Sequence, residues 1–135
     1  FLNEYFDRIV SVSTVEHVGM GVYGDPVYDQ GDEIAISQMV RMVRRDGRIL
    51  LTLPYAKEHA VARWLGGYER HYDSETLRRL LKNLKILKLQ LYSPRMRFAG
   101  FRFNWKRVSQ DDVNRECYKP FHTHAVACLV SAKLS

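Results

Sequence analysis

Four side chains that could take part in chemistry stand together near the start of the chain. They are Ser13, Thr14, Glu16 and His17, and they lie at the end of the apolar run over residues 6–13. Ligands of open α/β sheets bind outside the carboxyl ends of the strands, so this segment is the first place to look for a site. The unperturbed pKa of a histidine side chain lies near neutral pH, so His17 is a candidate general base. The alternative for His17 is a hydrogen bond that only orders the strand end.

A glycine-rich segment follows, with the spacing G-x-G-x-x-G over residues 19–24. In dinucleotide-binding proteins this motif follows its strand at once and opens a helix. Here residues 14–18 intervene, and Pro26 disfavours a helix at Asp25. We therefore interpret the segment as a flexible loop at the mouth of a site and not as a phosphate cradle.

A strand, a helix and a second strand are needed to position these side chains. Residues 6–13 and the apolar run over residues 49–53 predict two buried strands. Between them, apolar residues recur at helical spacing after Asp32, which could cap a helix. The basic residues before Gly47 indicate the end of that helix, with Gly47 as a left-handed cap. This order predicts a right-handed crossover between parallel strands.

The remaining elements are expected to cover this unit and extend its sheet. We predict a short helix over residues 57–65, a polar and aromatic loop over residues 68–72, and a second helix capped by Asp73 or Ser74. Alternation over residues 86–92 predicts a strand that ends at Pro94 and turns Leu87, Leu89 and Leu91 to one side. The apolar run over residues 125–134 predicts a last strand, antiparallel to both neighbours.

Residues 95–107 hold basic and aromatic residues and no acidic one. Such a surface can bind single-stranded nucleic acid. The alternative, which we favour, is an edge strand or insertion whose Phe101, Phe103 and Trp105 face the core. A short helix is expected to begin near Ser109.

Length and composition limit the number of domains, the partners and the cellular compartment that can be expected. A chain of 135 residues is long enough for one domain, over residues 1–135, with one core. The net charge of +6 permits an anionic partner, although solubility explains it as well. No apolar run approaches the roughly 20 residues that cross a bilayer, so no membrane partner is expected. Cys117 and Cys128 are too few for a disulfide framework, which indicates a reducing cytoplasm.

Two stretches carry a resemblance to a known family. The first is Phe6-Asp7-Arg8-Ile9-Val10-Ser11-Val12-Ser13-Thr14-Val15-Glu16-His17-Val18, and the second is Asp46-Gly47-Arg48-Ile49-Leu50-Leu51-Thr52-Leu53-Pro54. Together with the last apolar run, they resemble the second half of class I S-adenosylmethionine-dependent methyltransferases. The resemblance implies a partial Rossmann-like methyltransferase fold. Its mixed sheet would have about four strands, two of them parallel, with a carboxyl-terminal antiparallel piece and flanking helices.

The resemblance also implies roles for residues after the first strand. Ser13 and Thr14 would border the methionine end of the S-adenosylmethionine cofactor, while Glu16 and His17 would face the substrate as catalytic residues. Some relatives bind a divalent metal through E-x-x-E-H, but Ser13 replaces the first carboxylate here, so no metal is expected. Further along the chain, three candidate substrate-binding residues are Tyr55, Tyr68 and His71, for which loop packing is an equal explanation.

The family builds its cofactor site mainly from a glycine-rich turn and an acidic residue that this sequence lacks. The resemblance therefore implies a half-domain that would methylate a small-molecule or sugar-like acceptor. The apolar edge of residues 6–13 should pair with something, and a second copy forming a homo-oligomer is one possibility. The alternatives are a non-catalytic interaction module that keeps half the fold, and an RNA-binding or RNA methyltransferase fragment using residues 95–107.

Overall fold

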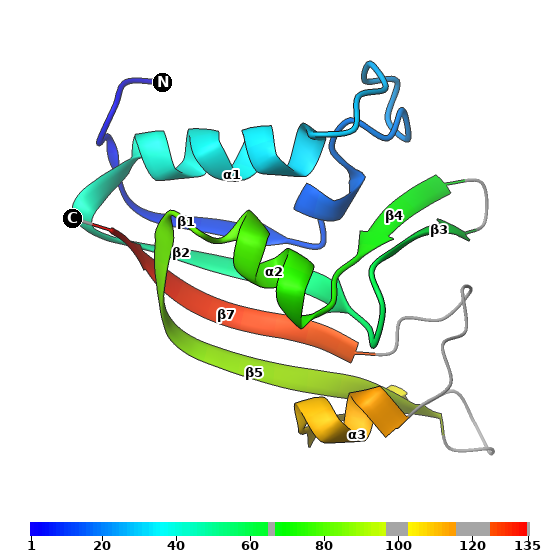
Figure 1. Ribbon diagram of the computed structural model, residues 1–135. Helices are drawn as coiled ribbons and strands as arrows, with labels where there is room; N and C mark the ends of the chain where they lie inside the picture. The colour runs from blue at the N-terminus through cyan, green and yellow to red at the C-terminus, as the bar shows by residue number, and fades with distance from the viewer. Residues whose placement is uncertain (65–66, 97–102, 116–124, 135) are drawn as a thin grey trace.

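The computed structural model describes residues 1–64, 67–96, 103–115 and 125–134, which form an α/β fold with a five-stranded mixed sheet (Figure 1). In spatial order the sheet contains β1 (Phe6–Val12), β2 (Val43–Tyr55), β7 (Ala125–Lys133), β5 (Leu84–Met96) and β6 (Phe103–Val108). A separate hairpin contains β3 (Ala60–Trp64) and β4 (Gly67–His71). The helices are the 3-10 helix η1 (Val15–His17), α1 (Gly31–Met42), α2 (Ser74–Leu80) and α3 (Gln110–Arg115).

The predicted crossover between two parallel strands is confirmed, but the prediction that the first strand is buried is wrong, because only Ser11 of β1 is buried and Val10 and Val12 are exposed. β1 and β2 are parallel, with Val10 opposite Leu50, and α1 connects them. Helices α1 and α2 cover the same face of the sheet (Figure 1). Alternate residues of β2 point under these helices, so Ile49, Leu51 and Leu53 are buried in the core. The carboxyl ends of β1 and β2 therefore meet at one edge of the sheet.

The predicted last strand is also confirmed, because β7 lies antiparallel between β2 and β5. The prediction that β5 ends at Pro94 is wrong, since the strand continues to Met96. Pairing with β7 stops at Tyr92, so Pro94 faces only β6 and its missing N–H is tolerated. A register shift lies between Ile86 and Lys88.

The expected alternation in β5 holds only in part. Leu91 is buried, but Leu87 and Leu89 are each 46% exposed. The register shift separates Leu87 from the regular pairing, whereas Leu89 pairs in register opposite Leu129 and is exposed all the same. Strand β6 forms the far edge of the sheet as expected, yet Trp105 does not face the core, being 49% exposed. Phe101 and the side chain of Phe103 lie outside the described residues.

The predicted helix over residues 57–65 and the predicted loop over residues 68–72 are both wrong, because most of these residues form the β3–β4 hairpin. Ala60 pairs with His71, and Val61 pairs with Arg70. The hairpin is joined to β2 by two backbone hydrogen bonds, Ala56 N to Tyr72 O at 2.9 Å and Tyr72 N to Pro54 O at 3.0 Å. Pairing with a neighbouring strand has overridden the local helical spacing.

Both predicted ends of α1 differ from the structure. The amino-terminal cap is Gln30 and not Asp32, which is buried. The helix ends at Met42 and β2 begins at once, so Gly47 lies within the strand and is not a left-handed cap. A Cβ at Gly47 would lie 2.8 Å from the Asp7 carbonyl oxygen, so close approach to β1 requires glycine here.

The cap of α2 is confirmed. The Asp73 carboxylate accepts hydrogen bonds from Glu75 N at 3.1 Å and Thr76 N at 2.8 Å, and Thr76 completes a capping box. The leucine face of this helix is buried as predicted. The short helix predicted near Ser109 is present as α3, which places Val113 in the core.

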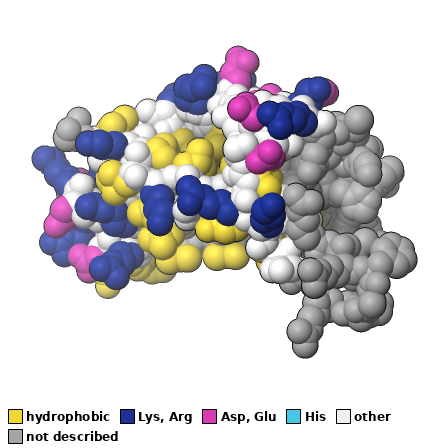
Figure 2. Space-filling model, turned by 90° about the horizontal axis from the view of Figure 1, so that it is seen from below, with side chains coloured by type: hydrophobic (Ala, Val, Ile, Leu, Met, Phe, Trp, Pro, Cys, Tyr) yellow, Lys and Arg dark blue, Asp and Glu magenta, His cyan; other side chains and the backbone are white. Residues whose placement is uncertain are grey.

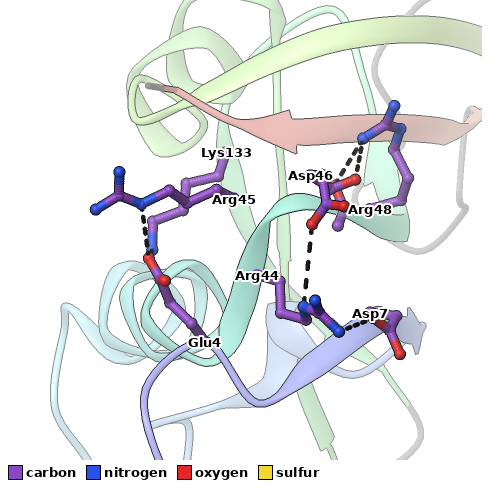
Figure 3. Close-up of polar contacts among 8 residues, drawn as sticks. Glu4, Asp7, Arg44, Arg45, Asp46, Arg48 and Lys133 are labelled. Carbon is purple, nitrogen blue, oxygen red and sulfur yellow. Dashed lines mark hydrogen bonds and ion pairs between the residues drawn. The ribbon is translucent and has the colours of Figure 1, made fainter.

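Ion pairs gather where α1 passes into β2, at the end of the sheet opposite the carboxyl ends of β1 and β2 (Figure 3). Glu4 Oε1 lies 3.4 Å from Arg45 Nε and 3.1 Å from Lys133 Nζ, and Arg44 Nη1 lies 2.8 Å from Asp7 Oδ1. Most of these groups are solvent-exposed, so each pair adds little stability. They join the amino-terminal segment to the crossover.

The other face of the sheet is open. Figure 2 shows hydrophobic side chains exposed there, with Lys and Arg alongside. A shallow groove on this face is lined in part by Val10, Val12, Leu50, Cys128 and Val130. Val10 is 64% and Val12 62% exposed. Within the described part of the chain, no helix is both long and apolar enough to cross a membrane.

Candidate functional site

The chain turns sharply at the carboxyl end of β1. Ser13 adopts a φ of 44°, which is uncommon for a residue with a side chain, and its N–H donates to Thr52 Oγ1 of β2 at 3.0 Å. Thr14 Oγ1 donates to the Val12 carbonyl at 2.9 Å. Both Ser13 and Thr14 are exposed. The turn thus presents two hydroxyl side chains at the edge where ligands of α/β sheets bind.

Strand β4 lies against η1 and engages His17. Nδ1 of His17 lies 2.7 Å from the Tyr68 carbonyl oxygen, and its ring makes an edge contact with Tyr23 at a centroid distance of 5.9 Å. A carbonyl only accepts hydrogen bonds, so Nδ1 carries the proton. In the neutral ring Nε2 is then free of a proton and can accept one. The orientation of the His17 ring therefore leaves Nε2 as the atom that could act as a general base.

Glu16 is 1% exposed, and its Oε2 has no hydrogen-bond partner among the described residues. The pKa of this carboxyl is raised to about 7, mainly by burial and to a smaller extent by the charge of Glu69, while backbone hydrogen bonds and His17 oppose the shift. A carboxyl that titrates near neutral pH can take or give a proton under physiological conditions. Glu16 and His17, predicted as catalytic residues, therefore lie on the same turn of η1 with chemistry suited to proton transfer.

Glu69 and His71 form a pair on one side of β4. Glu69 Oε1 lies 2.6 Å from Nε2 of His71, which is buried. Tyr68, from the same strand, is 38% exposed. Of the three residues predicted to bind substrate, the structure places Tyr68 against His17 of η1, whereas His71 is buried beside Glu69. The third, Tyr55, lies in the hydrophobic core, where burial raises the pKa of its hydroxyl.

The sequence analysis missed Arg70, which joins the site to the rest of the fold. Its buried guanidinium donates to the carbonyl oxygens of Val18 at 2.7 Å and Asp29 at 3.0 Å, with longer bonds of 3.4 Å to Glu16 and Tyr28. Arg70 thereby holds both ends of the loop between η1 and α1 against β4.

Asp32 and Tyr72 complete this polar network under the loop. Arg70 Nε lies 3.8 Å from Asp32 Oδ2, which accepts a 2.8 Å hydrogen bond from the Tyr72 hydroxyl. Burial and the Asp32 charge raise the pKa of Tyr72, so its hydroxyl remains a donor. The sequence held no clear signal for this network, because residues 68–72 place three polar residues between two tyrosines without alternation, and Arg70, His71 and Tyr72 are all buried.

The glycine-rich loop has its own internal bonds. Asp25 Oδ2 accepts from Gly19 N at 2.7 Å, and Oδ1 accepts from Tyr23 N at 3.3 Å. These backbone donors are therefore occupied by a carboxylate, which agrees with the interpretation that the motif is not a phosphate cradle. A Cβ at Gly31 would lie 2.1 Å from the Val18 carbonyl oxygen, so glycine lets α1 begin directly beside the site.

No group of three or more potential metal ligands occurs in the part of the chain that the structure describes. At this edge Glu69 lies 2.6 Å from His71.

The sequence profile described as "Caenorhabditis protein of unknown function, DUF268" matches residues 2–93, which is more than half of the chain. The chain belongs to the DUF268 family. The match runs from the segment before β1 into β5, so it includes every residue of the candidate site. The family description names no activity. Curated proteins gave no significant match.

Two solved structures resemble this member of the family over nearly its whole length. The first is a 1,6-didemethyltoxoflavin-N1-methyltransferase from Burkholderia thailandensis with bound 1,6-didemethyltoxoflavin and S-adenosylhomocysteine. Its TM-score is 0.60 at 10% identity, over 98% of this chain and 46% of that one. The second is an S-adenosylmethionine-dependent methyltransferase from Thermotoga maritima, a possible histamine N-methyltransferase. Its TM-score is 0.54 at 12% identity, over 99% of this chain and 58% of that one.

These likenesses establish the fold. The mixed sheet with its flanking helices is the Rossmann-like fold of S-adenosylmethionine-dependent methyltransferases, as the sequence resemblance predicted. The chain spans about half the length of the two methyltransferases, given the 46% and 58% of their chains that it covers.

Proposed function

We propose that the chain forms part of an S-adenosylmethionine-dependent methyltransferase that acts on a small-molecule acceptor. The observation that carries the proposal is the structural likeness to two such enzymes over 98% and 99% of the chain. The side chains at the carboxyl ends of β1 and β2 support it, because ligands of this fold bind at that edge.

Ser13 and Thr14 fit the methionine end of the cofactor. Both side chains are exposed, and among the described residues the Ser13 hydroxyl makes no hydrogen bond, so it is available to a ligand. Thr14 Oγ1 donates to Val12 and can still accept a bond. When bound, S-adenosylmethionine supplies a methyl group activated by its sulfonium. These two residues would hold and orient that end of the cofactor.

Glu16 and His17 are proposed to face the acceptor. The free Nε2 of His17 would take the proton that the acceptor loses, and Glu16 would hold the acceptor in line. Tyr68 would cover one side of the acceptor. Most of the rate acceleration of methyl transfer would come from orienting the acceptor against the methyl group of the cofactor and from excluding water, as for other transfers between two bound molecules.

Methyl transfer by the full-length protein tests this proposal. Incubation with labelled S-adenosylmethionine and a panel of small acceptors should give a labelled product. The variant His17→Ala should lower kcat about a hundredfold, because proton transfer by a positioned base contributes that much. Unchanged turnover in His17→Ala would remove this residue from the mechanism, and absence of any transfer would count against the methyltransferase itself.

A second candidate function is RNA binding at the β6 edge. Trp105, Lys106 and Arg107 are all exposed on this strand, which suits stacking on bases with contacts to phosphates. RNA affinity should then fall steeply as salt increases. No retention of RNA at low salt would exclude this function.

A further inference from the structure

The face of the sheet opposite α1 and α2 carries an apolar surface that crosses three strands (Figure 2). Val10 of β1 lies opposite Leu50 of β2, and Leu50 lies opposite Val130 of β7. Two residues further along β2, Thr52 lies opposite Cys128. All of these residues line the shallow groove described above. We call this set the apolar row.

The exposure of the apolar row is unusual for the strands that carry it. β1 and β2 are parallel, and sheets with parallel strands are normally covered on both faces, mostly by helices. Here Val10 and Val12 are each more than half exposed. An exposed apolar patch rimmed by polar groups is typical of a binding surface. A helix would supply the layer that this side of the sheet lacks.

Lysine side chains border the apolar row along β5. Lys88 lines the groove and lies opposite Val130. Lys85 lies opposite Ala132, which is two residues from Val130 and therefore on the same face of β7. Both lysines are exposed. A ligand seated on the apolar row would thus meet two ammonium groups at this border.

Two arginines border the apolar row where β1 and β2 begin their regular pairing. Arg8 lies opposite Arg48, two residues before Val10 and Leu50, so both arginines belong to the same face. Both are exposed. No acidic residue is found among the described residues that line the groove. The surface is therefore apolar at its centre and cationic at its border, which favours a partner with the opposite charge.

We propose that this face binds an amphipathic helix of a partner protein, with its apolar stripe on the apolar row and acidic residues toward Lys85, Lys88 and Arg8. Such a helix joins apolar and anionic groups in the order that the face requires. A second copy of the chain fits less well, because two of these faces would bring cation against cation. The inference does not depend on methyl transfer, since the candidate active site lies at the ends of the strands and not on this face.

Two synthetic helices test the proposal on the 135-residue chain. Each peptide is about 18 residues long, roughly five turns, with leucines along one stripe, and the stripe is flanked by glutamates in one peptide and by lysines in the other. Fluorescence anisotropy at low salt measures their affinities. The glutamate peptide should bind at least about tenfold more tightly than the lysine peptide, because only its flanks complement the cationic border. Added salt should narrow the difference.

Charge reversal identifies the residues responsible. Lys85→Glu combined with Lys88→Glu should reverse the preference, so that the lysine peptide binds more tightly. The control combines Arg78→Glu with Lys82→Glu, two exposed residues on and just after α2, and changes the net charge equally on the other side of the sheet. It should keep the preference for the glutamate peptide. Val10→Gln should weaken both peptides about fivefold, because part of the apolar contact is lost.

Circular dichroism of each variant verifies that the fold is retained. Absence of saturable binding by the glutamate peptide would overturn the proposal, as would equal affinities for the two peptides or a preference that survives Lys85→Glu with Lys88→Glu. A dimer of the chain that excludes the peptide would assign the face to a second copy. Displacement of the peptide by phosphatidylserine vesicles would assign the face to a membrane surface. Either of these results would also overturn the proposal.

Discussion

Glu16 couples the candidate site to the stability of the fold. Its pKa rises from 4.5 to about 7 in the folded chain, chiefly through burial. The folded state therefore binds a proton more tightly than the unfolded state, and this group's contribution to stability is complete below pH 4.5. That contribution is lost as the pH rises to about 7, and the loss is about 3 kcal/mol.

Denaturant unfolding at several pH values checks this expectation. The free energy of unfolding should fall between pH 5 and pH 7.5, and the fall should be smaller in Glu16→Gln, which cannot ionise. The charged or titratable groups near Glu16 include His17, Glu69 and Arg70. A Glu16→Gln variant with an unchanged pH dependence would mean that Glu16 is already ionised in the fold.

Arg70 is expected to be the most important single polar residue for the loop beside the site. Arg70→Met should lower the free energy of unfolding by roughly 3–5 kcal/mol, because it leaves Asp32 as a buried charge and several carbonyls without donors. The exposed Arg78→Met should change it by less than about 0.5 kcal/mol. Urea denaturation measures both. A loss for Arg70→Met no larger than that for Arg78→Met would show that the network is dispensable.

At this scale the sequence predicted only part of the site. Ser13, Thr14, Glu16 and His17 were located because a strand end in an α/β sheet is a known position for ligands. Arg70, Asp32 and Glu69 were missed, because their importance depends on which strand lies over η1. No local spacing encodes the distance between a β4 carboxylate and a helix far earlier in the chain. Tyr55 shows the reverse, since its place at a strand end was predicted but its burial in the core was not.

At the scale of elements, the cap of α2 is the clearest link between sequence and stability. Asp73→Ala removes the hydrogen bonds that the carboxylate accepts from Glu75 N at 3.1 Å, from Thr76 N and Thr76 Oγ1 at 2.8 Å each, and from His59 N at 3.2 Å. We expect a loss of about 1 kcal/mol or somewhat more in the free energy of unfolding. Thermal denaturation should show it, with Glu58→Ala as the exposed acidic control. Equal melting temperatures for the two variants would argue against the cap.

Helices and strands with a clear apolar pattern were predicted correctly. The β3–β4 hairpin, whose structure depends on strand pairing, was not. The crossover, α2 and β7 follow from their apolar patterns. The β3–β4 hairpin does not, since residues 57–65 carry apolar side chains at spacing that fits a helix equally well. Pairing across the hairpin and two backbone bonds to β2 select the strand, and those contacts are visible only in three dimensions.

At the scale of the whole molecule, β1 is a candidate for self-association. It pairs only with β2 among the described strands, and Val10 and Val12 are exposed beside its open edge. An open apolar edge favours pairing with another chain, so we expect the mass of the 135-residue chain to rise with concentration in light scattering. Val10→Lys should lower that mass without loss of folding, because Val10 is already exposed. A monomer at every concentration would contradict association through β1.

Binding of S-adenosylmethionine at the carboxyl end of β1 is the central claim, and calorimetric titration of the full-length protein tests it most directly. We predict saturable binding that weakens about tenfold when Ser13→Ala and Thr14→Ala are combined, because each hydroxyl supplies one hydrogen bond. Ser37→Ala, an exposed serine on α1, should leave the affinity unchanged. Absence of binding, or binding that the combined variant leaves unaltered, would contradict the claim.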